Sequence, residues 1–382
     1  MARHVPRPTP GNWQNWRMSI QRFVGRPDWY TTFNPETLTA TGDALRWGVV
    51  ATGNIARTVT ADLALLEDAV LHAVSSRGVG SAAGFATDFG FATYYYDGGE
   101  DGTAAAGYLQ LVQDPDVDVV YIATPHAQHY DIAKAALEHG KHVLCEKALT
   151  ITAAEARALI ELARERQQFL MEAVWARFVP GFQRALEILE SGEIGQVKWV
   201  RADLGFPAPM DDSARIWAPA DGGGALLDIS VYPLLWAWGT LGAPEAVHAT
   251  AELTALGVDA QNSLALSYAN GAQAQLISYL GSHGPRAAAI SGTLGFIETI
   301  GSVNNPKGLR IGVGWEEERE EYFEHPGSGY TYQLREVTRC IQAGLTESAT
   351  MPLADSLAIM ELFDNAREQI GVSYPNDSRT DL

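Results

Sequence analysis

Cysteine, basic side chains and long apolar runs are scarce in this chain, and each shortage excludes a class of protein. Its 382 residues include two cysteines, Cys145 and Cys340, so we expect no disulfide framework and predict a reducing, cytoplasmic location. No stretch of about 18 apolar residues occurs, so we expect no membrane-spanning helix. The N-terminal residues carry basic charge without an apolar stretch, so a secretion signal is not expected.

Acidic residues clearly outnumber basic ones. The chain has 46 Asp and Glu against 27 Lys and Arg, which gives a formal net charge of −19. Such a surface repels nucleic acid and anionic membranes, so neither is an expected partner. The composition therefore favours an enzyme for small molecules or a protein that binds another protein. The length is too great for one ordinary core and predicts two domains.

Residues 1–44 differ in composition and periodicity from the rest of the chain. They are rich in Pro, Trp, Arg and Thr and show no clean period. We interpret them as an N-terminal arm or extension, and the alternative is a disordered tail. Their aromatic residues favour an arm that packs on its own body or on a neighbouring subunit, because disordered segments are usually poor in aromatics. Trp13, Trp16, Trp29 and Tyr30 are among these aromatics.

Residues 45–172 alternate apolar strand patterns with helical patterns. Such alternation predicts an α/β domain, with a doubly wound parallel sheet that has helices on both faces. The expected strands cover 45–51, 69–75, 117–124, 141–146 and 169–174, and the expected helices cover 54–68, 80–90, 127–140 and 152–167.

Residues 173–372 change to successive strands joined by short turns. This pattern predicts a second domain with an open, mostly antiparallel sheet. The expected strands cover 197–205, 245–253, 263–268, 272–280, 287–293 and 295–300, and two helices are expected at 330–344 and 353–371. We interpret residues 373–382 as a tail.

The first strand runs into a glycine turn typical of dinucleotide-binding proteins. Residues 51–56, ATGNIA, follow the pattern G-x-G-x-x-G/A with alanine at the first position. Gly53 would let the backbone approach a pyrophosphate, and the amides of a helix starting near Asn54 would point at the phosphates. A degenerate turn is weak evidence alone, but its place between a strand and a helix favours nucleotide binding. The expected contacts are Ala51, Thr52, Gly53, Asn54 and Ile55.

The end of the second strand indicates which dinucleotide is bound. An NAD enzyme tends to place Asp or Glu here for the ribose 2′-hydroxyl, whereas this chain has Ser76 and Arg77. Hydroxyls and a guanidinium suit a 2′-phosphate, so we predict NADP, with NAD as the alternative cofactor. The competing interpretation is that Arg77 is only a solvated loop charge.

Polar residues follow three of the expected strands. Ligands bind outside the carboxyl ends of a doubly wound sheet, so we expect these residues to face the cofactor and the substrate. A lysine there can hydrogen-bond a reacting oxygen and lower the pKa of a neighbouring acid, although Glu146 and Lys147 could also form a structural ion pair. We expect no metal site, because His126 and His129 lack a suitably spaced carboxylate or cysteine. The expected contacts are Ala123, Thr124, Pro125, His126, His129, Glu146, Lys147, Trp175 and Arg177.

A second cluster lies in DGGGALLDISVYPLLWAW, where a glycine run precedes an apolar helical pattern. Asp228 and Tyr232 are four residues apart and would project from one helix face. Alone they could be a helix cap and a core aromatic. A tyrosine has an ordinary pKa of about 10, and a nearby Lys147 would stabilise its phenolate. We therefore predict that Asp228 and Tyr232 handle a substrate hydroxyl.

These motifs together resemble the Gfo/Idh/MocA oxidoreductases. The segments ATGNIA, YIATPHAQHY, AALEHGKHVLCEKALT, FLMEAVWARFVP, SGEIGQV and GGGALLDISVYPLLW come in the order and spacing of that family, and they are most similar to its branch of dimeric dihydrodiol dehydrogenases and NADP-dependent D-xylose dehydrogenases. The likeness spans residues 45–372. Three positions depart from the family pattern: Ala51 for glycine, His126 for asparagine and Ala148 for proline.

The resemblance implies a Rossmann domain followed by a substrate and dimerisation domain, whose open sheet often forms a dimer face. It also implies that Lys147 is catalytic, that Tyr232 is the acid or base, and that Asp228 matches an acid one helical turn earlier. Trp175 and Arg177 match a motif that lies beside the nicotinamide. The expected partners are thus a sugar or diol substrate and a second copy of the chain.

The resulting expectation is an NADP-dependent dehydrogenase that oxidises an aldopyranose such as D-xylose to a lactone. Trp175, Trp217 and Trp236 are expected around the cleft, where they could stack on a sugar or on an arene. Rival enzyme activities are trans-dihydrodiol oxidation and reduction of a keto- or anhydro-sugar. A non-enzymatic NADP sensor would not need the set of Lys147, Asp228 and Tyr232, and a scaffold would leave the glycine turn empty.

Overall fold

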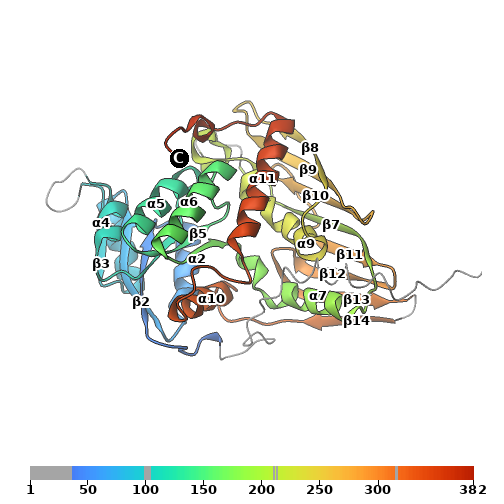
Figure 1. Ribbon diagram of the computed structural model, residues 1–382, viewed down its shortest axis with the longest axis horizontal. Helices are drawn as coiled ribbons and strands as arrows, with labels where there is room; N and C mark the ends of the chain where they lie inside the picture. Colours follow the sequence, from blue (N-terminus) through green and yellow to red (C-terminus); the bar gives the residue numbers. More distant parts are fainter. Residues whose placement is uncertain (1–36, 99–104, 210, 212–213, 315–316) are drawn as a thin grey trace, which may run out of the picture.

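The computed structural model describes residues 37–98, 105–209, 211, 214–314 and 317–382. Two sheets lie side by side, and helices cover them and fill the junction between them (Figure 1). Most of the predicted arm, including Trp13, Trp16, Trp29 and Tyr30, lies outside the described residues. The described end of the arm, residues 37–44, packs on the first domain through side chains considered below.

The N-terminal sheet is wholly parallel, with strand order β3-β2-β1-β4-β5-β6. This order reverses between β1 and β4, which is where doubly wound folds bind dinucleotides. The predicted doubly wound architecture is therefore confirmed. The strands are β1 (Leu45–Val50), β2 (Ala69–Ser76), β3 (Thr93–Tyr96), β4 (Val119–Ile122), β5 (His142–Glu146) and β6 (Leu170–Ala173).

Helices flank this sheet on both faces, as the alternating pattern requires. α6 begins at a capping box in which Thr152 and Glu155 bond each other's backbone amides, so its start is well defined. The predicted domain boundary at 172/173 falls one residue before the end of β6. The helices are α2 (Asn54–Leu63), α3 (Val79–Phe89), α4 (Gly107–Gln113), α5 (His129–Glu138) and α6 (Ala153–Arg166).

The C-terminal sheet has eight strands in the order β14-β13-β12-β11-β7-β10-β9-β8. Each neighbouring pair is antiparallel except β7 with β10, so the predicted open, mostly antiparallel sheet is confirmed. Its strands are β7 (Val197–Gly205), β8 (Ala246–Leu253), β9 (Asp259–Ser267), β10 (Gln273–Tyr279), β11 (Ala288–Gly292), β12 (Gly295–Ser302), β13 (Asn305–Val313) and β14 (Glu317–Tyr322).

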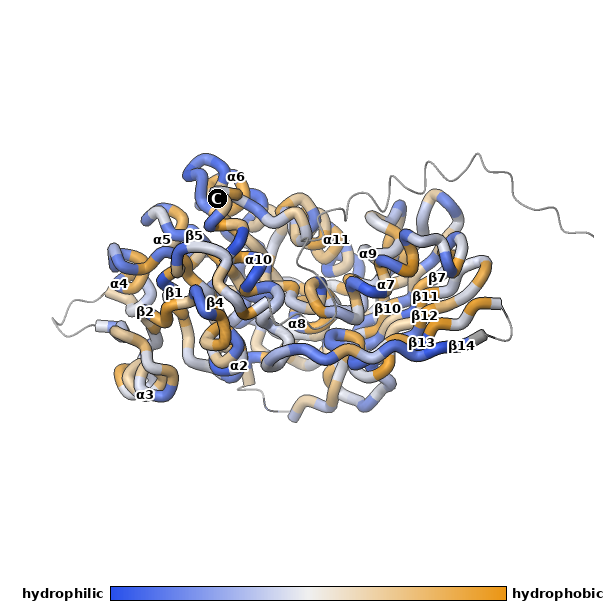
Figure 2. Tube along the Cα trace, turned by 90° about the horizontal axis from the view of Figure 1, so that it is seen from below, coloured by the Kyte–Doolittle hydropathy of each residue, from blue (hydrophilic) through white to orange (hydrophobic). Residues whose placement is uncertain are grey.

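One face of the C-terminal sheet packs on helices and forms the second core. Burial alternates along β10, where Ala274 and Leu276 point to that core while Gln275 and Ile277 are exposed. The alternation of apolar and polar residues along these strands is visible in Figure 2. The helices on this side are α7 (Pro180–Ser191), α8 (Ala225–Ile229), α9 (Val231–Leu241) and α11 (Leu353–Ile370).

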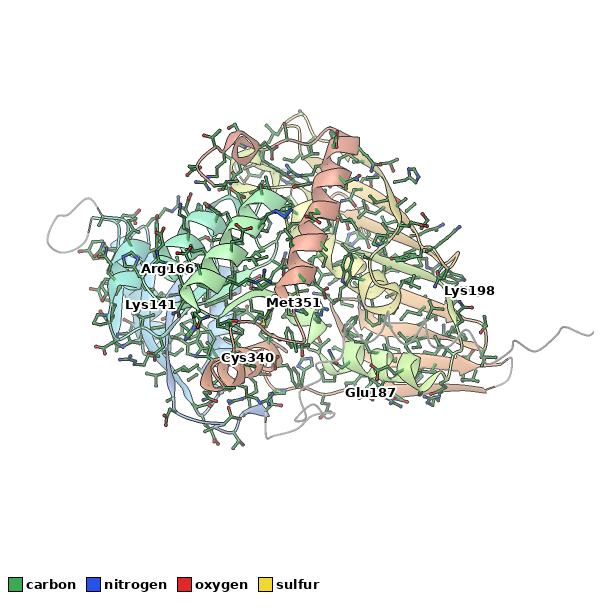
Figure 3. All side chains as sticks on the ribbon, in the orientation of Figure 1. Lys141, Arg166, Glu187, Lys198, Cys340 and Met351 are labelled. Atoms are coloured by element: carbon green, nitrogen blue, oxygen red, sulfur yellow. The ribbon has the colours of Figure 1, made fainter. Side chains whose placement is uncertain are left out.

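The chain returns to the first domain in α10 (Thr331–Gln342), which packs against α2. Both cysteines are free and buried, and Cys340 lies in this helix (Figure 3). The predicted tail is ordered: it forms a short 3₁₀ turn at Pro375–Ser378, and the preceding Tyr374 is buried. In the described ranges, no helix combines the length and the apolar character that a membrane crossing would need.

A buried ion pair joins α10 to the first domain. Arg335 and Asp68 lie 2.8 Å apart, and both side chains are about 1% exposed. Arg335 also donates to the carbonyl of Thr37 and to the hydroxyl of Thr41, so it holds the described end of the arm. Although burial raises the pKa of Asp68, hydrogen bonds from Arg335 and its neighbours outweigh burial and lower that pKa to about 2.

We expect Asp68→Asn to lower the free energy of unfolding by about 3–5 kcal/mol, because it leaves the Arg335 guanidinium buried without a counter-charge. Urea unfolding followed by circular dichroism measures this change. Asp116→Asn is the matched control, since Asp116 pairs with Arg46 on the surface and its side chain is 63% exposed. Equal midpoints for the two variants would contradict the assigned role of the buried pair.

Candidate active site

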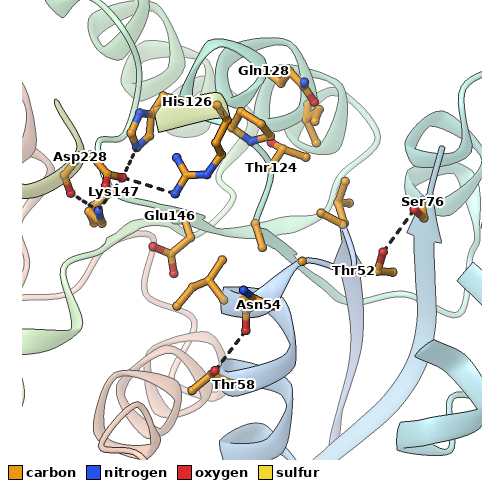
Figure 4. A pocket seen from close by; sticks show the side chains of 18 of the residues that line it. Thr52, Asn54, Thr58, Ser76, Thr124, His126, Gln128, Glu146, Lys147 and Asp228 are labelled. Atoms are coloured by element: carbon orange, nitrogen blue, oxygen red, sulfur yellow. Dashed lines mark hydrogen bonds and ion pairs between the residues drawn. The ribbon is translucent and has the colours of Figure 1, made fainter. Parts of the chain in front are cut away.

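A cavity of about 950 Å³ lies along the carboxyl ends of β1, β2, β4 and β5 and extends to α8, α9 and the end of β7. Residues from both domains line it (Figure 4). Its position at the switch point of the N-terminal sheet fits the binding of a dinucleotide. Of the predicted site residues, it is lined by Ala51, Thr52, Gly53, Asn54, Ile55, Ser76, Arg77, Ala123, Thr124, Pro125, His126, Glu146, Lys147, Asp228 and Tyr232.

The glycine turn has the backbone that its sequence pattern requires. Ala51, at the first glycine position, has φ = +94°, a value that favours glycine, and its amide donates to the carbonyl of Ser75. α2 begins at Asn54, with Gly53 as its N-cap. Apart from Gly53 and its two chain neighbours, no atom of the described residues lies within 4 Å of where a Cβ on Gly53 would be, so the space in front of this helix end is open to a phosphate.

The far end of the cavity presents hydroxyls and a guanidinium. Ser76, Arg77 and Ser81 line it, and the hydroxyls of Thr52 and Ser76 are 3.3 Å apart. Asp97 also lines the cavity, and its carboxylate accepts a hydrogen bond from the amide of Gly107 at the start of α4. The end of β2 thus offers donors suited to a phosphate, while the nearby carboxylate serves the fold.

Lys147 and Asp228 meet across the two domains. The Lys147 ammonium donates to the backbone carbonyl of Asp228 and lies 3.5 Å from its carboxylate Oδ1. Both side chains are about nine-tenths buried, and Figure 4 shows them together beside His126. These contacts fix the position of the Lys147 ammonium group. Because Asp228 belongs to the second domain, that domain determines where the ammonium group lies.

Three cationic or polar groups surround the Asp228 carboxylate. Burial alone would raise the pKa of Asp228, but the charges of Lys147 and Arg215, with His126, lower it to about 2. The Arg215 guanidinium and the His126 Nε2 lie 3.5 and 3.8 Å from Oδ1. Burial in turn lowers the pKa of His126 to about 3, and its Nδ1–H donates to the carbonyl of Gly222. This histidine is therefore neutral.

The run of three glycines brings α8 to this point. Gly224 has φ = +107°, and a Cβ there would lie 2.4 Å from the Asp259 carboxylate. That carboxylate accepts from the amide of Leu226 in the first turn of α8. The phenol of Tyr374 donates to the carbonyl of Gly223, so the predicted tail also fixes the turn. Glycine is required at position 224 because the Asp259 carboxylate occupies the space that a Cβ would take.

Tyr232 lies just past Ser230, where α8 passes into α9 with helical backbone angles. Asp228 and Tyr232 consequently both face the cavity, as their spacing predicts. The Nε1–H of Trp175 donates to the Tyr232 oxygen at 3.1 Å, and the Lys147 ammonium lies 5.3 Å from the centre of its ring.

The pKa of Tyr232 differs from the sequence expectation. Burial and the negative charge of Glu146 raise it well above the ordinary value, and the hydrogen bond from Trp175 offsets this only partly. The expected lowering by Lys147 is not seen, because that ammonium is turned toward Asp228. The phenol is therefore protonated at neutral pH.

Glu146 lines the cavity, but its carboxylate is hydrogen-bonded to a residue of the sheet. The phenol of Tyr121 donates to its Oε1 at 2.7 Å, and burial raises the pKa of the Glu146 carboxyl while the Lys147 charge lowers it. Its negative charge faces the same region as Tyr232, which explains its effect on that phenol.

Three predicted contact residues lie behind the cavity wall. His129 is buried, and its two ring nitrogens lie 2.8 and 2.9 Å from the carbonyls of Ala148 and Thr124, which joins the loops after β5 and β4. Arg177 is buried, pairs with Asp355 of α11 and does not line the cavity, so its contact with the nicotinamide stays a prediction. Trp175 reaches the site only through its hydrogen bond to Tyr232.

The cavity aromatics also differ from those expected. Trp217 and Trp236 are about 1% exposed and donate to the carbonyls of Pro209 and Val303, so they belong to the core. Phe206, at the end of β7, lines the cavity and is 42% exposed. Phe206 was not predicted, because a single aromatic after a strand has no periodic signal. Other lining residues that were not predicted include Tyr108, Leu204, Arg215, Arg286 and Asn304.

One trio outside the cavity brings possible metal-ligand atoms together. In the described part of the chain, atoms of His72, Asp114 and Asp116 lie within 4.8 Å of one another. Asp114 already accepts from His72 and Tyr95, and Asp116 pairs with Arg46. These contacts account for the cluster as part of the fold.

We expect Gly224→Ala to lower the thermal midpoint of unfolding by several degrees more than Gly271→Ala. Both positions have positive φ, but the space around Gly271 is open whereas a Cβ at Gly224 meets Asp259. Differential scanning calorimetry measures the two midpoints. A Gly224→Ala midpoint at or above that of Gly271→Ala would contradict the close approach.

Comparison with known proteins places these features in one family. Residues 45–174 match the GFO/IDH/MocA family description "Oxidoreductase family, NAD-binding Rossmann fold", and residues 182–298 match the GFO/IDH/MocA C-terminal domain. The chain is 35% identical over 350 residues to the trans-1,2-dihydrobenzene-1,2-diol dehydrogenase of Mus musculus, covering 88% of this chain and 100% of that protein. It is 34% identical over 375 residues to the D-xylose 1-dehydrogenase (NADP(+)) of Hypocrea jecorina, covering 88% and 95%.

Solved structures agree with this assignment. A 3-ketoreductase from Actinomadura kijaniata in complex with NADP and TDP-benzene is 26% identical, with a TM-score of 0.75 over 86% of this chain and 98% of that one. An aldose–aldose oxidoreductase from Caulobacter crescentus, 24% identical over 85% of this chain and 97% of that one, shares the fold with a TM-score of 0.76. The chain belongs to the Gfo/Idh/MocA family and is an oxidoreductase with the NAD-binding Rossmann domain of that family.

Proposed function

We propose that this protein is an NADP-dependent dehydrogenase that oxidises a cyclic aldose at C1 and gives a lactone. One observation carries the proposal: Lys147 from the first domain and Tyr232 from the second line one cavity with the glycine turn. The 34% identity to an NADP-dependent D-xylose 1-dehydrogenase supports an aldopyranose as substrate.

The donors at the end of β2 support NADP as the cofactor, with NAD as the alternative. The residues that would hold it are those of the glycine turn for the pyrophosphate, and Ser76 and Arg77 for the 2′-phosphate. When bound, the nicotinamide supplies the carbon that accepts a hydride from the sugar. The protein must therefore place the sugar C1 next to that ring and remove the proton of its hydroxyl.

Tyr232 is the residue proposed to remove that proton. In the oxidative direction its phenolate oxygen accepts the C1 hydroxyl proton, and in the reductive direction its phenol returns it. Lys147 donates a hydrogen bond to the reacting oxygen and stabilises the negative charge that forms there. Asp228 keeps the ammonium in place, as its two contacts with Lys147 imply. Holding the sugar against the ring supplies much of the remaining acceleration.

Oxidation of trans-dihydrodiols is the second candidate. The 35% identity to a trans-1,2-dihydrobenzene-1,2-diol dehydrogenase favours it, and the exposed ring of Phe206 offers an apolar surface for an unsaturated ring. Reduction of a keto- or anhydro-sugar remains a further alternative. A sensor that binds NADP without turnover is the non-enzymatic alternative, and it would be inert across a substrate panel.

We further propose that two copies associate through the uncovered face of the C-terminal sheet, as the family resemblance implies. On that face Trp199 of β7 and Ile277 of β10 are 43% and 47% exposed, and their strands are neighbours. A cytoplasmic location stays a prediction, which rests on the two cysteines being free and buried.

We expect Lys147→Ala to lower kcat for aldose oxidation at least hundredfold while the affinity for NADPH changes little, because the ammonium acts on the reacting oxygen. Steady-state rates with aldoses and trans-diols, with NADP⁺ and with NAD⁺, measure turnover, and NADPH fluorescence measures binding. Lys198→Ala is the control, since Lys198 is exposed on β7 away from the cavity (Figure 3). Full activity of Lys147→Ala would reject the mechanism, and inertness of the wild type with every substrate would reject the enzyme.

We expect kcat for oxidation to rise with pH across the alkaline range, because the pKa of Tyr232 is raised and only its phenolate accepts a proton. Trp175→Phe removes the donor that favours the phenolate, so it should raise that pKa further and lower kcat at pH 8 about tenfold. The pH profile of kcat measures both effects. Trp199→Phe, at an exposed position of β7, should leave the profile unchanged. An unshifted profile for Trp175→Phe would show that this hydrogen bond has no part in the titration.

A further inference from the structure

An exposed guanidinium that has no ion pair with any described residue lies on the substrate side of the cavity. Arg286, between β10 and β11, lines the cavity together with Leu204, Phe206 and Tyr232. Its Nη2 donates to the hydroxyl of Ser302 at 3.0 Å, and within the described ranges no carboxylate forms an ion pair with it. A cationic group with only a neutral partner keeps most of its hydrogen-bonding capacity for a ligand.

The backbone at Arg286 is held in an unusual conformation. Its φ is +60°, a left-handed value that non-glycine residues rarely adopt. The Asp203 carboxylate on β7 accepts from the Arg286 amide at 2.7 Å, and the Arg286 carbonyl accepts from the amide of Val303 at 2.7 Å. Val303 in turn accepts from Trp236, one helical turn after Tyr232 on α9. The loop is therefore fixed to the element that carries the proposed base.

The other charges of the cavity have partners or an assigned ligand. Asp228 is balanced by Lys147 and Arg215, and Glu146 accepts from a phenol. Arg77 is also without an ion pair in the described residues, but it follows β2, where the 2′-phosphate of the cofactor is expected. Arg286 is thus a positive charge that the cofactor assignment does not use, in a chain whose net charge is −19.

We propose that Arg286 binds an anionic group on the substrate, a carboxylate or a phosphate, at the end of the sugar remote from the oxidised carbon. The inference rests on the proposed aldose oxidation and names its substrate class: acidic or phosphorylated sugars are preferred to neutral ones. The guanidinium fork matches the geometry of both anions, and the exposed side chain is accessible to a ligand that enters the cavity.

D-Glucose, D-glucuronate and D-glucose 6-phosphate form a matched test series, because they share one pyranose ring and differ only at C6. For the wild type we expect kcat/KM with NADP⁺ to be at least tenfold higher for one of the two anionic sugars than for glucose, with the preference decreasing at high salt. The better of the two identifies the anion. Equal values, or a preference for glucose, would overturn this inference while leaving sugar oxidation in place. Absence of turnover with all three, and with D-xylose, would overturn both proposals.

Arg286→Gln assigns the preference to this residue. We expect the ratio of kcat/KM for the anionic sugar to that for glucose to fall at least tenfold, while Arg286→Lys retains part of it. Arg166→Gln is the control, since Arg166 is exposed at the end of α6 (Figure 3), and it should keep the wild-type ratio. A proportional loss with every sugar, or a rise confined to the KM for NADP⁺, would show that Arg286 serves the loop or the cofactor instead.

Discussion

The contact between Lys147 and Asp228 is the constraint on which the rest of the site depends. It joins the end of β5 in one domain to α8 in the other, and it removes two opposite charges from water together. A lysine buried without such a partner would favour its neutral form, and so would a carboxylate. The pair therefore explains how the cavity keeps charged groups beside the position proposed for the reacting carbon.

Residues from distant parts of the chain hold Lys147 and Asp228 in this contact. The three glycines bring α8 close, Asp259 holds the first turn of that helix, and His126 and Arg215 complete the surroundings of the carboxylate. On the other side, His129 joins the two loops that carry Thr124 and Lys147. Trp175 and the Arg177–Asp355 pair lie behind the residues that line the cavity. Residues that seem to belong to the site by sequence position thus act through the residues that line it.

Much of this arrangement could be predicted from local sequence patterns. The predictions that were wrong or missing have physical reasons. The parallel strands and the helices between them carry strong periodic signals, and the spacing of Asp228 and Tyr232 survives the junction at Ser230. β14 was missed because its sequence, EEREEY, is charged at nearly every position, and the short β3 was missed because TYYY shows no alternation. Trp217 and Trp236 were misplaced because aromatic character does not distinguish a core residue from a cavity wall. Arg286 and Phe206 lie after strand ends, where only the assembled fold reveals what they face.

The hydrogen bond between the Tyr374 phenol and the Gly223 carbonyl spans 151 positions of the chain. A polypeptide leaving the ribosome can form its nucleotide-binding half early, since that half is made largely of neighbouring segments. The hydrogen bond from Tyr374 to the glycine run can form only after residue 374 has left the ribosome. Completion of the glycine run that positions Asp228 is therefore one of the last events of biosynthesis.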